Sequence, residues 1–103
     1  LQSLLFIAKH GGRGWIYGEN CVWTLIRNSS VRLEGRGDVA VFCPDGRAEG
    51  VCLRGLKYEL EDAVITSDFP LGVSNSMKAP EAEIEVGNGA LLIMYGSEIG
   101  EKD

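Results

Sequence analysis

Turn signals at short intervals constrain the fold of this chain more than any other feature of its sequence. Short runs of β-branched, aromatic and aliphatic residues alternate with turns such as Asn28-Ser29-Ser30, Pro44-Asp45-Gly46 and Gly87-Asn88-Gly89. The runs, about eight or nine of them, have the length of strands. The 14 glycines and only 3 prolines among 103 residues suit many tight turns. The pattern predicts an antiparallel β-sandwich or barrel.

Individual runs indicate which strands are buried. Residues 39–43 are nearly all apolar, as in a central strand that is covered on both faces. Residues 82–86 alternate between apolar and acidic side chains, so we expect one face of that strand to be solvated. Residues 21–26 and 90–95 are further strands rich in β-forming residues.

The first ten residues have a different pattern. Apolar side chains at positions 1, 4, 5 and 8 have the spacing of one helix face, and Gly11-Gly12 offers the left-handed conformation that ends a helix. We therefore expect one short N-terminal helix. The chain begins with Leu1, which suggests a piece of a longer protein, and its acidic end, residues 98–103, is expected to be frayed.

Composition and charge exclude several classes of function. A net charge of −5 argues against nucleic acid as a partner and makes a cationic or neutral small molecule easier to bind. No apolar run approaches the roughly 18 residues of a membrane span, so no membrane partner is expected. Cys21, Cys43 and Cys52 are odd in number and lack C-x-x-C spacing, which favours free thiols in a reducing cytoplasm over a metal site or disulfides.

Catalytic and metal-binding patterns are absent from the sequence. A serine nucleophile needs an activating base, and the single histidine, His10, is remote in sequence from Ser74. The carboxylates cluster on turns or on the solvated face of residues 81–85. We therefore predict no catalytic residue and no metal ligand in this chain.

Residues 55–77 are the best candidate for a binding site. They contain an aromatic residue, Tyr58, and two adjacent polar side chains, Ser74 and Asn75, which follow a glycine. A β-scaffold can hold such groups at the mouth of an apolar pocket. The alternatives are that Tyr58 is a core aromatic and that Ser74 and Asn75 close a turn through bonds to the backbone.

Two elements of this stretch resemble a known family. Gly55-Leu56-Lys57-Tyr58-Glu59-Leu60 resembles the G-L-K-Y/W-x-L element of thiamine pyrophosphokinases, and Leu71-Gly72-Val73-Ser74-Asn75 is similar to their L-G-x-S-N element. Residues 83–93 resemble the family's closing hairpin, a V-x-x-G-x-L-L pattern, and residues 1–25 resemble the segment that leaves its catalytic domain. The resemblance covers nearly the whole chain.

The resemblance implies a jelly-roll β-sandwich that binds thiamine and belongs to a homodimeric enzyme. That enzyme transfers pyrophosphate from ATP, with Mg²⁺, to thiamine, giving thiamine diphosphate. Residues 1–20 would be a remnant helix and linker from an upstream nucleotide-binding domain, residues 21–97 the sandwich and residues 98–103 the tail. The family's G-G-R-x-D-H motif is not matched, because Gly11-Gly12-Arg13 lacks the Asp-His pair. This chain would therefore bind thiamine without catalysing its transfer reaction.

Carried over by position, Tyr58, Ser74 and Asn75 would contact thiamine. An aromatic ring can hold a cation with about 0.5–2 kcal/mol, and Ser and Asn can donate to and accept from ring nitrogens. Tyr58 stands where eukaryotic members have Trp, and Gly72 stands where they have the first Ser of Ser-x-Ser-Asn, so the chain is closer to bacterial members. The alternative is a non-catalytic β-sandwich used for assembly or dimerisation.

Overall fold

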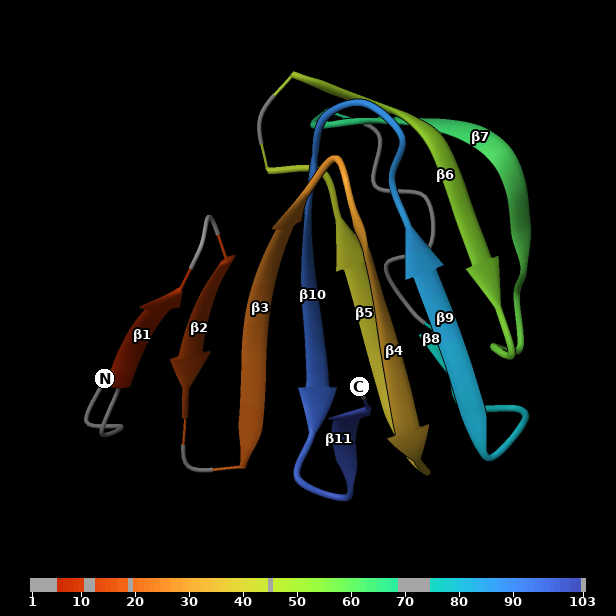
Figure 1. The fold of residues 1–103 in the computed structure, drawn as a ribbon. Helices are drawn as coiled ribbons and strands as arrows, with labels where there is room; N and C mark the ends of the chain where they lie inside the picture. Colours follow the sequence, from red (N-terminus) through yellow and green to blue (C-terminus); the bar gives the residue numbers. More distant parts are fainter. Residues whose placement is uncertain (1–5, 11–12, 19, 45, 69–74, 103) are drawn as a thin grey trace.

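The structure, a computed structural model, contains strands joined by turns and loops in the part of the chain that it describes. It describes residues 6–10, 13–18, 20–44, 46–68 and 75–102, with side chains from residue 15 onward. Eleven strands form two antiparallel sheets in these ranges, which contain no helix. Figure 1 shows the strands of the two sheets running in two layers.

One sheet has six strands, in the order β1-β2-β3-β10-β5-β8. The pairing brings the last long strand of the chain between two early ones, so residues far apart in sequence share this sheet. The strands are β1 (Phe6–His10), β2 (Arg13–Tyr17), β3 (Cys21–Arg27), β5 (Asp38–Phe42), β8 (Asn75–Ser76) and β10 (Ala90–Gly96).

The other sheet has five strands, in the order β11-β4-β9-β6-β7. Its pairing of β6 with β7 is interrupted by register shifts between Ala48 and Leu53. The strands are β4 (Ser30–Gly35), β6 (Arg47–Arg54), β7 (Leu60–Thr66), β9 (Glu81–Glu85) and β11 (Ile99–Lys102).

The core lies between the two sheets. Every second residue of a strand points inward, so Leu91 and Ile93 of β10 are fully buried and join one apolar cluster with Leu33, Leu53 and Ile84 of the facing sheet. Burial of such side chains contributes about 1.5–3 kcal/mol each. Burial alternates along β10 although its sequence is apolar throughout, so its place in the sheet determines which face meets the core.

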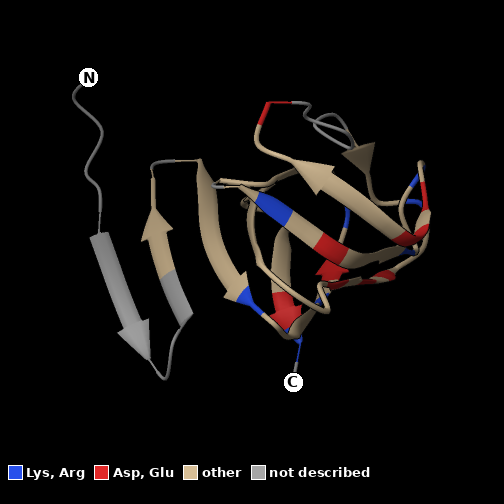
Figure 2. Ribbon diagram, turned by 90° about the horizontal axis from the view of Figure 1, so that it is seen from above, with Lys and Arg blue, Asp and Glu red and all other residues tan. Residues whose placement is uncertain are grey.

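The outer faces of the two sheets differ in chemistry. The five-stranded sheet carries alternating charges, including Arg32, Glu83 and Arg54. Strands β3, β10 and β5 of the other sheet hold between them only two charged residues, Arg27 and Asp38, both at strand ends. Figure 2 shows the charged positions concentrated on one side of the molecule.

A side-chain contact connects the two sheets near the end of the chain. The Trp15 indole Nε1 donates a hydrogen bond of 2.6 Å to Oε2 of Glu101, and the Tyr95 hydroxyl donates one of 3.1 Å to the same oxygen. Trp15 belongs to β2 and Glu101 to β11. Because one carboxylate oxygen accepts both bonds, it ties the two sheets together at this edge.

Two expectations differ from the structure. The helix is wrong for Phe6–His10, which form β1 and pair with β2, while residues 1–5 and the Gly11-Gly12 cap lie outside the described residues. The tail, expected to be frayed over residues 98–103, contains β11, because residues 99–102 find partners on β4. Within residues 1–20, strand β2 pairs with β3 and extends the six-stranded sheet.

Candidate functional site

A tight loop over residues 55–59 connects β6 to β7 and presents the candidate aromatic. The apolar-aromatic composition of residues 55–60 favours a strand here, but β7 begins only at Leu60. Gly55 has φ +79°, and a Cβ atom at this position would lie 2.3 Å from the carbonyl oxygen of Glu81, so the chain turns here in a conformation open to glycine. Leu56 is fully buried and anchors the loop in the core.

The side chain of Asn75 holds this loop against β8. Its Oδ1 accepts hydrogen bonds of 3.0 Å from the backbone N–H of Tyr58 and of 3.0 Å from that of Ser76, and its Nδ2 donates one of 2.8 Å to the Tyr58 carbonyl oxygen. The Lys57 N–H donates a further bond of 2.9 Å to the carbonyl oxygen of Ser76. Asn75 is only 6% exposed, so these bonds satisfy most of an amide that is buried.

Lys57, Tyr58 and Glu59 are the residues of this loop whose side chains lie at the surface. Tyr58 is 58% exposed, which contradicts the alternative that it is a core aromatic. The Lys57 Nζ lies 5.4 Å from the centre of the Tyr58 ring, so the chain's own cation occupies one face of that ring. A cationic ligand must use the other face or displace this ammonium.

A groove of about 460 Å³ lies beside the loop. Its volume falls in the range of about 300–1,000 Å³ that is usual for small-molecule sites. The groove brings together the outer face of the six-stranded sheet and the loop that Asn75 holds. Its lining residues are Asp38, Val39, Ala40, Phe42, Lys57, Asn75, Ser76 and Met94.

The groove combines an apolar wall with a few polar groups. Ala40 and Phe42 of β5 pair with Met94 and Leu92 of β10, and residues paired across antiparallel strands share a face. The Phe42 ring stacks on Trp23 of β3 with centres 6.0 Å apart and an angle of 24° between planes. A flat, partly apolar molecule suits such a wall.

Two of the three predicted site residues lie together. The side chain of Asn75 is hydrogen-bonded to the backbone of Tyr58. The side chain of Tyr58 does not line the groove. Ser74 lies outside the described residues. The alternative that Asn75 closes a turn through bonds to the backbone agrees with its observed contacts.

Asp38 and Phe42 are groove residues that the sequence pattern did not single out. Residues 39–43 read as a strand covered on both faces, whereas Phe42 is only half-buried and its ring lies toward the groove. The available signal was the single carboxylate of Asp38, directly before an uninterrupted apolar run.

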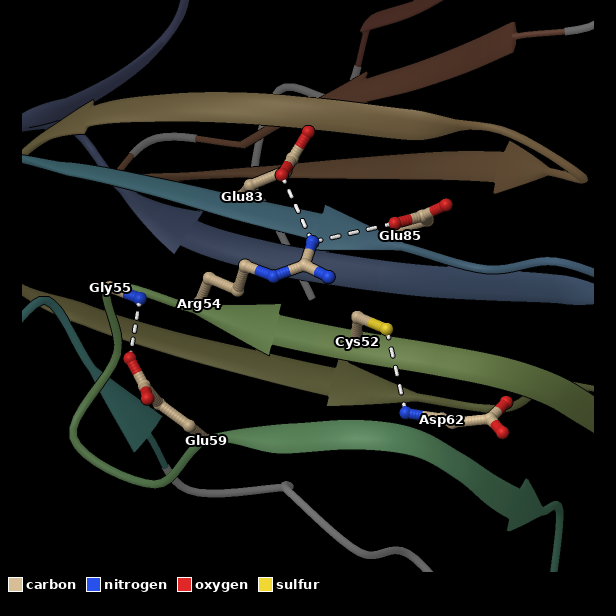
Figure 3. Close-up of polar contacts among 7 residues, drawn as sticks. All are labelled: Cys52, Arg54, Gly55, Glu59, Asp62, Glu83 and Glu85. Carbon is tan, nitrogen blue, oxygen red and sulfur yellow. Dashed lines mark hydrogen bonds and ion pairs between the residues drawn. The ribbon is translucent and has the colours of Figure 1, made fainter.

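A second polar cluster lies on the outer face of the five-stranded sheet. Figure 3 shows Arg54 Nη1 between Glu83 and Glu85, at 3.1 and 3.5 Å from their carboxylate oxygens. Cys52 raises the pKa of Arg54, as does the hydrogen bond with Glu85. The Cys52 Sγ accepts a bond of 3.5 Å from the Asp62 N–H. Arg54 is shared by the two carboxylates, so this cluster keeps one unmatched negative charge on an exposed, flat sheet face.

This cluster borders only a small hollow of about 200 Å³. Within the described ranges, no three histidine, cysteine or acidic side chains gather closely enough to hold a metal ion. In the same ranges, no helix is long and apolar enough to cross a membrane. With about 460 Å³ against about 200 Å³, the groove beside the loop is the better candidate site.

Comparisons with known proteins agree with the motifs in this loop. Residues 31–91, more than half of the chain, match the family model of the thiamin pyrophosphokinase vitamin B1 binding domain. No curated protein matches the chain.

Solved structures of similar fold include thiamin pyrophosphokinases from Geobacillus thermodenitrificans (TM-score 0.74, 19% identity) and from Bacillus subtilis (TM-score 0.72, 16% identity). A thiamin pyrophosphokinase family protein from Enterococcus faecalis is also similar (TM-score 0.65, 16% identity). These alignments cover 81, 78 and 79% of this chain but only 40, 39 and 38% of the respective structures. The chain thus spans about two-fifths of the length of these proteins.

Proposed function

Because the chain belongs to the thiamin pyrophosphokinase vitamin B1 binding domain family, we propose that it binds thiamine beside the 55–59 loop. The main support for this proposal is the position of the loop. The family match includes it, Asn75 fixes its backbone, and a groove of small-molecule size opens next to it. Thiamine is a flat cation with an aminopyrimidine ring, so an aromatic surface and a few polar groups suit it.

Tyr58, Ser74 and Asn75 are the proposed contacts. The exposed Tyr58 ring offers a surface for stacking. Asn75 uses both acceptor directions of Oδ1 and one N–H of Nδ2 for the protein backbone, which leaves its second N–H for a ligand acceptor. Ser74 lies outside the described residues and is proposed as a contact from its place in the L-G-x-S-N element.

For the parent protein we propose transfer of pyrophosphate from ATP to thiamine, as a homodimeric enzyme. ATP and Mg²⁺ would bind in a nucleotide domain linked through residues 1–20. This chain's own part would be to bind and orient thiamine. We further assign the sandwich a jelly-roll connectivity and the protein to the cytoplasm, where free Cys21, Cys43 and Cys52 would stay reduced.

Titration calorimetry with thiamine on the full protein that carries this chain tests the proposal. We expect saturable heat in the wild type, and weaker binding in Tyr58→Ala and Ser74→Ala with unchanged thermal melting. Tyr17→Ala removes another exposed tyrosine, on β2, and serves as the matched control. An absence of saturable heat at millimolar thiamine would contradict the proposal.

A second candidate function is assembly through the outer face of the six-stranded sheet. Trp23, Leu25, Phe42, Leu92 and Met94 are only half-buried there and form a largely apolar surface. Such a surface is typical of subunit contacts. Light scattering over a range of concentrations tests it. We expect Leu92→Arg to reduce a dimer that Tyr58→Ala leaves intact, and a monomer at all concentrations would contradict assembly.

A further inference from the structure

We propose that the carboxylate of Asp38 is the counter-ion that holds the cationic ring of the ligand in the groove. This inference rests on the proposed function and assigns a specificity role within the same site. Asp38 belongs neither to the 55–59 loop nor to the Ser74-Asn75 pair.

Asp38 supplies negative charge to the groove that no described residue neutralises through an ion pair. It begins β5, pairs in register with Ser76 of β8, and lines the groove with an exposed side chain. The ion pairs among the described residues lie elsewhere, on the five-stranded sheet and its neighbouring turn. An exposed carboxylate beside an apolar wall favours a cation over an anion.

Lys57 is the one lysine or arginine among the described residues that line the groove. Its ammonium group lies over an aromatic ring outside the groove. Its Nζ lies over the ring of Tyr58, a residue that does not line the groove. The hydrogen-bonded backbone of Lys57 fixes the base of this side chain near Ser76. The charge of Asp38 therefore remains available to a ligand.

The spacing along β5 matches a ligand with a charged ring at one end and a neutral ring at the other. Asp38, Ala40 and Phe42 alternate with the core residues Val39 and Val41, so they share the outer face. At about 3.3 Å per residue, the Cα atoms of Asp38 and Phe42 are about 13 Å apart. Ala40 between them is small, which leaves room for a molecule lying along the strand. A thiazolium ring near Asp38 and an aminopyrimidine near Phe42 fit this order.

The experiment compares two probes on the full protein: thiamine, and the neutral aminopyrimidine alcohol that forms one half of it. For Asp38→Asn we expect thiamine affinity to fall roughly three- to tenfold, with the affinity for the neutral probe unchanged. Asp38→Glu keeps the charge and should retain most of the affinity. Glu61→Gln removes the charge of an exposed carboxylate on β7 and should change neither affinity. Added salt should narrow the difference between wild type and Asp38→Asn.

The outcomes separate this inference from the proposed function. If the wild type binds thiamine and Asp38→Asn binds it equally well, or loses affinity for both probes alike, the counter-ion role is wrong and the proposed function stands. If the wild type binds no thiamine, the proposed function fails and takes this inference with it. Equal melting temperatures of wild type and Asp38→Asn establish that any loss of affinity is not a loss of fold.

Discussion

Replacing Asn75 with alanine should destabilise the whole domain. The amide makes three hydrogen bonds to backbone groups, two with Tyr58 and one with Ser76. A hydrogen bond contributes about 0.5–1.5 kcal/mol net, and an unpaired buried group costs more. Since the site is partly buried, water can replace some of these bonds. We expect a loss of about 2–4 kcal/mol in the free energy of unfolding, which corresponds to a fall in melting temperature of roughly 10–20 °C.

Urea unfolding followed by circular dichroism measures this change. Asn88→Ala replaces an asparagine exposed in a hairpin turn and should alter stability by less than about 0.5 kcal/mol. Asn75→Asp keeps the acceptor oxygen but loses the donor to the Tyr58 carbonyl. At neutral pH we expect a loss similar to that of Asn75→Ala. At acidic pH, a protonated carboxyl can donate again, so part of the loss relative to wild type should recover.

A loss below about 0.5 kcal/mol for Asn75→Ala would refute the role of Asn75 as a support of the loop. Thiamine binding would then separate the two possible roles of the residue. Weak binding in a variant of wild-type stability would identify Asn75 as a ligand contact alone. Weak binding together with lost stability is the result that the three backbone bonds predict.

Three further predictions concern the loop and the charged face. Lys57→Met removes a competing cation from the Tyr58 ring and should raise thiamine affinity about two- to fivefold by calorimetry; unchanged or weaker binding would contradict this. Gly55→Ala forces a Cβ into the Glu81 carbonyl and should cost more than about 2 kcal/mol in urea unfolding; a neutral result would mean that the turn can shift. The hydrogen bond from Lys102, and then its charge, lower the pKa of Glu81, so their mutual stabilisation is present at neutral pH and is lost as pH falls through that pKa. In an NMR titration, Lys102→Met should raise the pKa of Glu81 toward its ordinary value, and no change would disprove the pairing.

The strands could be predicted where alternation or β-rich runs were long enough. Residues 21–26, 82–86 and 90–95 correspond closely to β3, β9 and β10. The first and last are rich in β-forming residues, and the alternation of residues 82–86 also indicates which face is buried. The end of the chain could not be predicted in this way. Its strand, β11, contains Gly100 and Glu101 and depends on backbone pairing with β4, which no local pattern records.

The candidate site was only partly predictable. The motif residues Gly55, Leu56 and Asn75 have structural roles here: a left-handed turn, a buried anchor and a bond to the loop. Short-range pattern suggested a strand through Tyr58, because an apolar-aromatic run has the composition of one. The contact of Asn75 with that loop spans 17 positions in sequence, and only the fold brings the two together.

Asp38 could not be linked to the loop from the sequence either. Asp38 lies in the groove because β5 pairs with β8, where Ser76 is opposite Asp38. Strand β8 starts 37 positions later in the sequence. A short edge strand of two residues leaves almost no pattern to detect. The chemistry of the groove therefore depends on a pairing that only the structure reveals.

The carboxylate of Glu101, which accepts bonds from Trp15 and Tyr95, couples the attachment of the carboxyl-terminal strand to the environment of a residue near the start of the chain. The oxygen of Glu101 accepts bonds from both, so peeling β11 away from β4 releases an indole on β2 and a phenol on β10 together. Damage to the last residues would thus loosen the edge of the opposite sheet where the first strands attach. The emission of Trp15 is a natural reporter of that event.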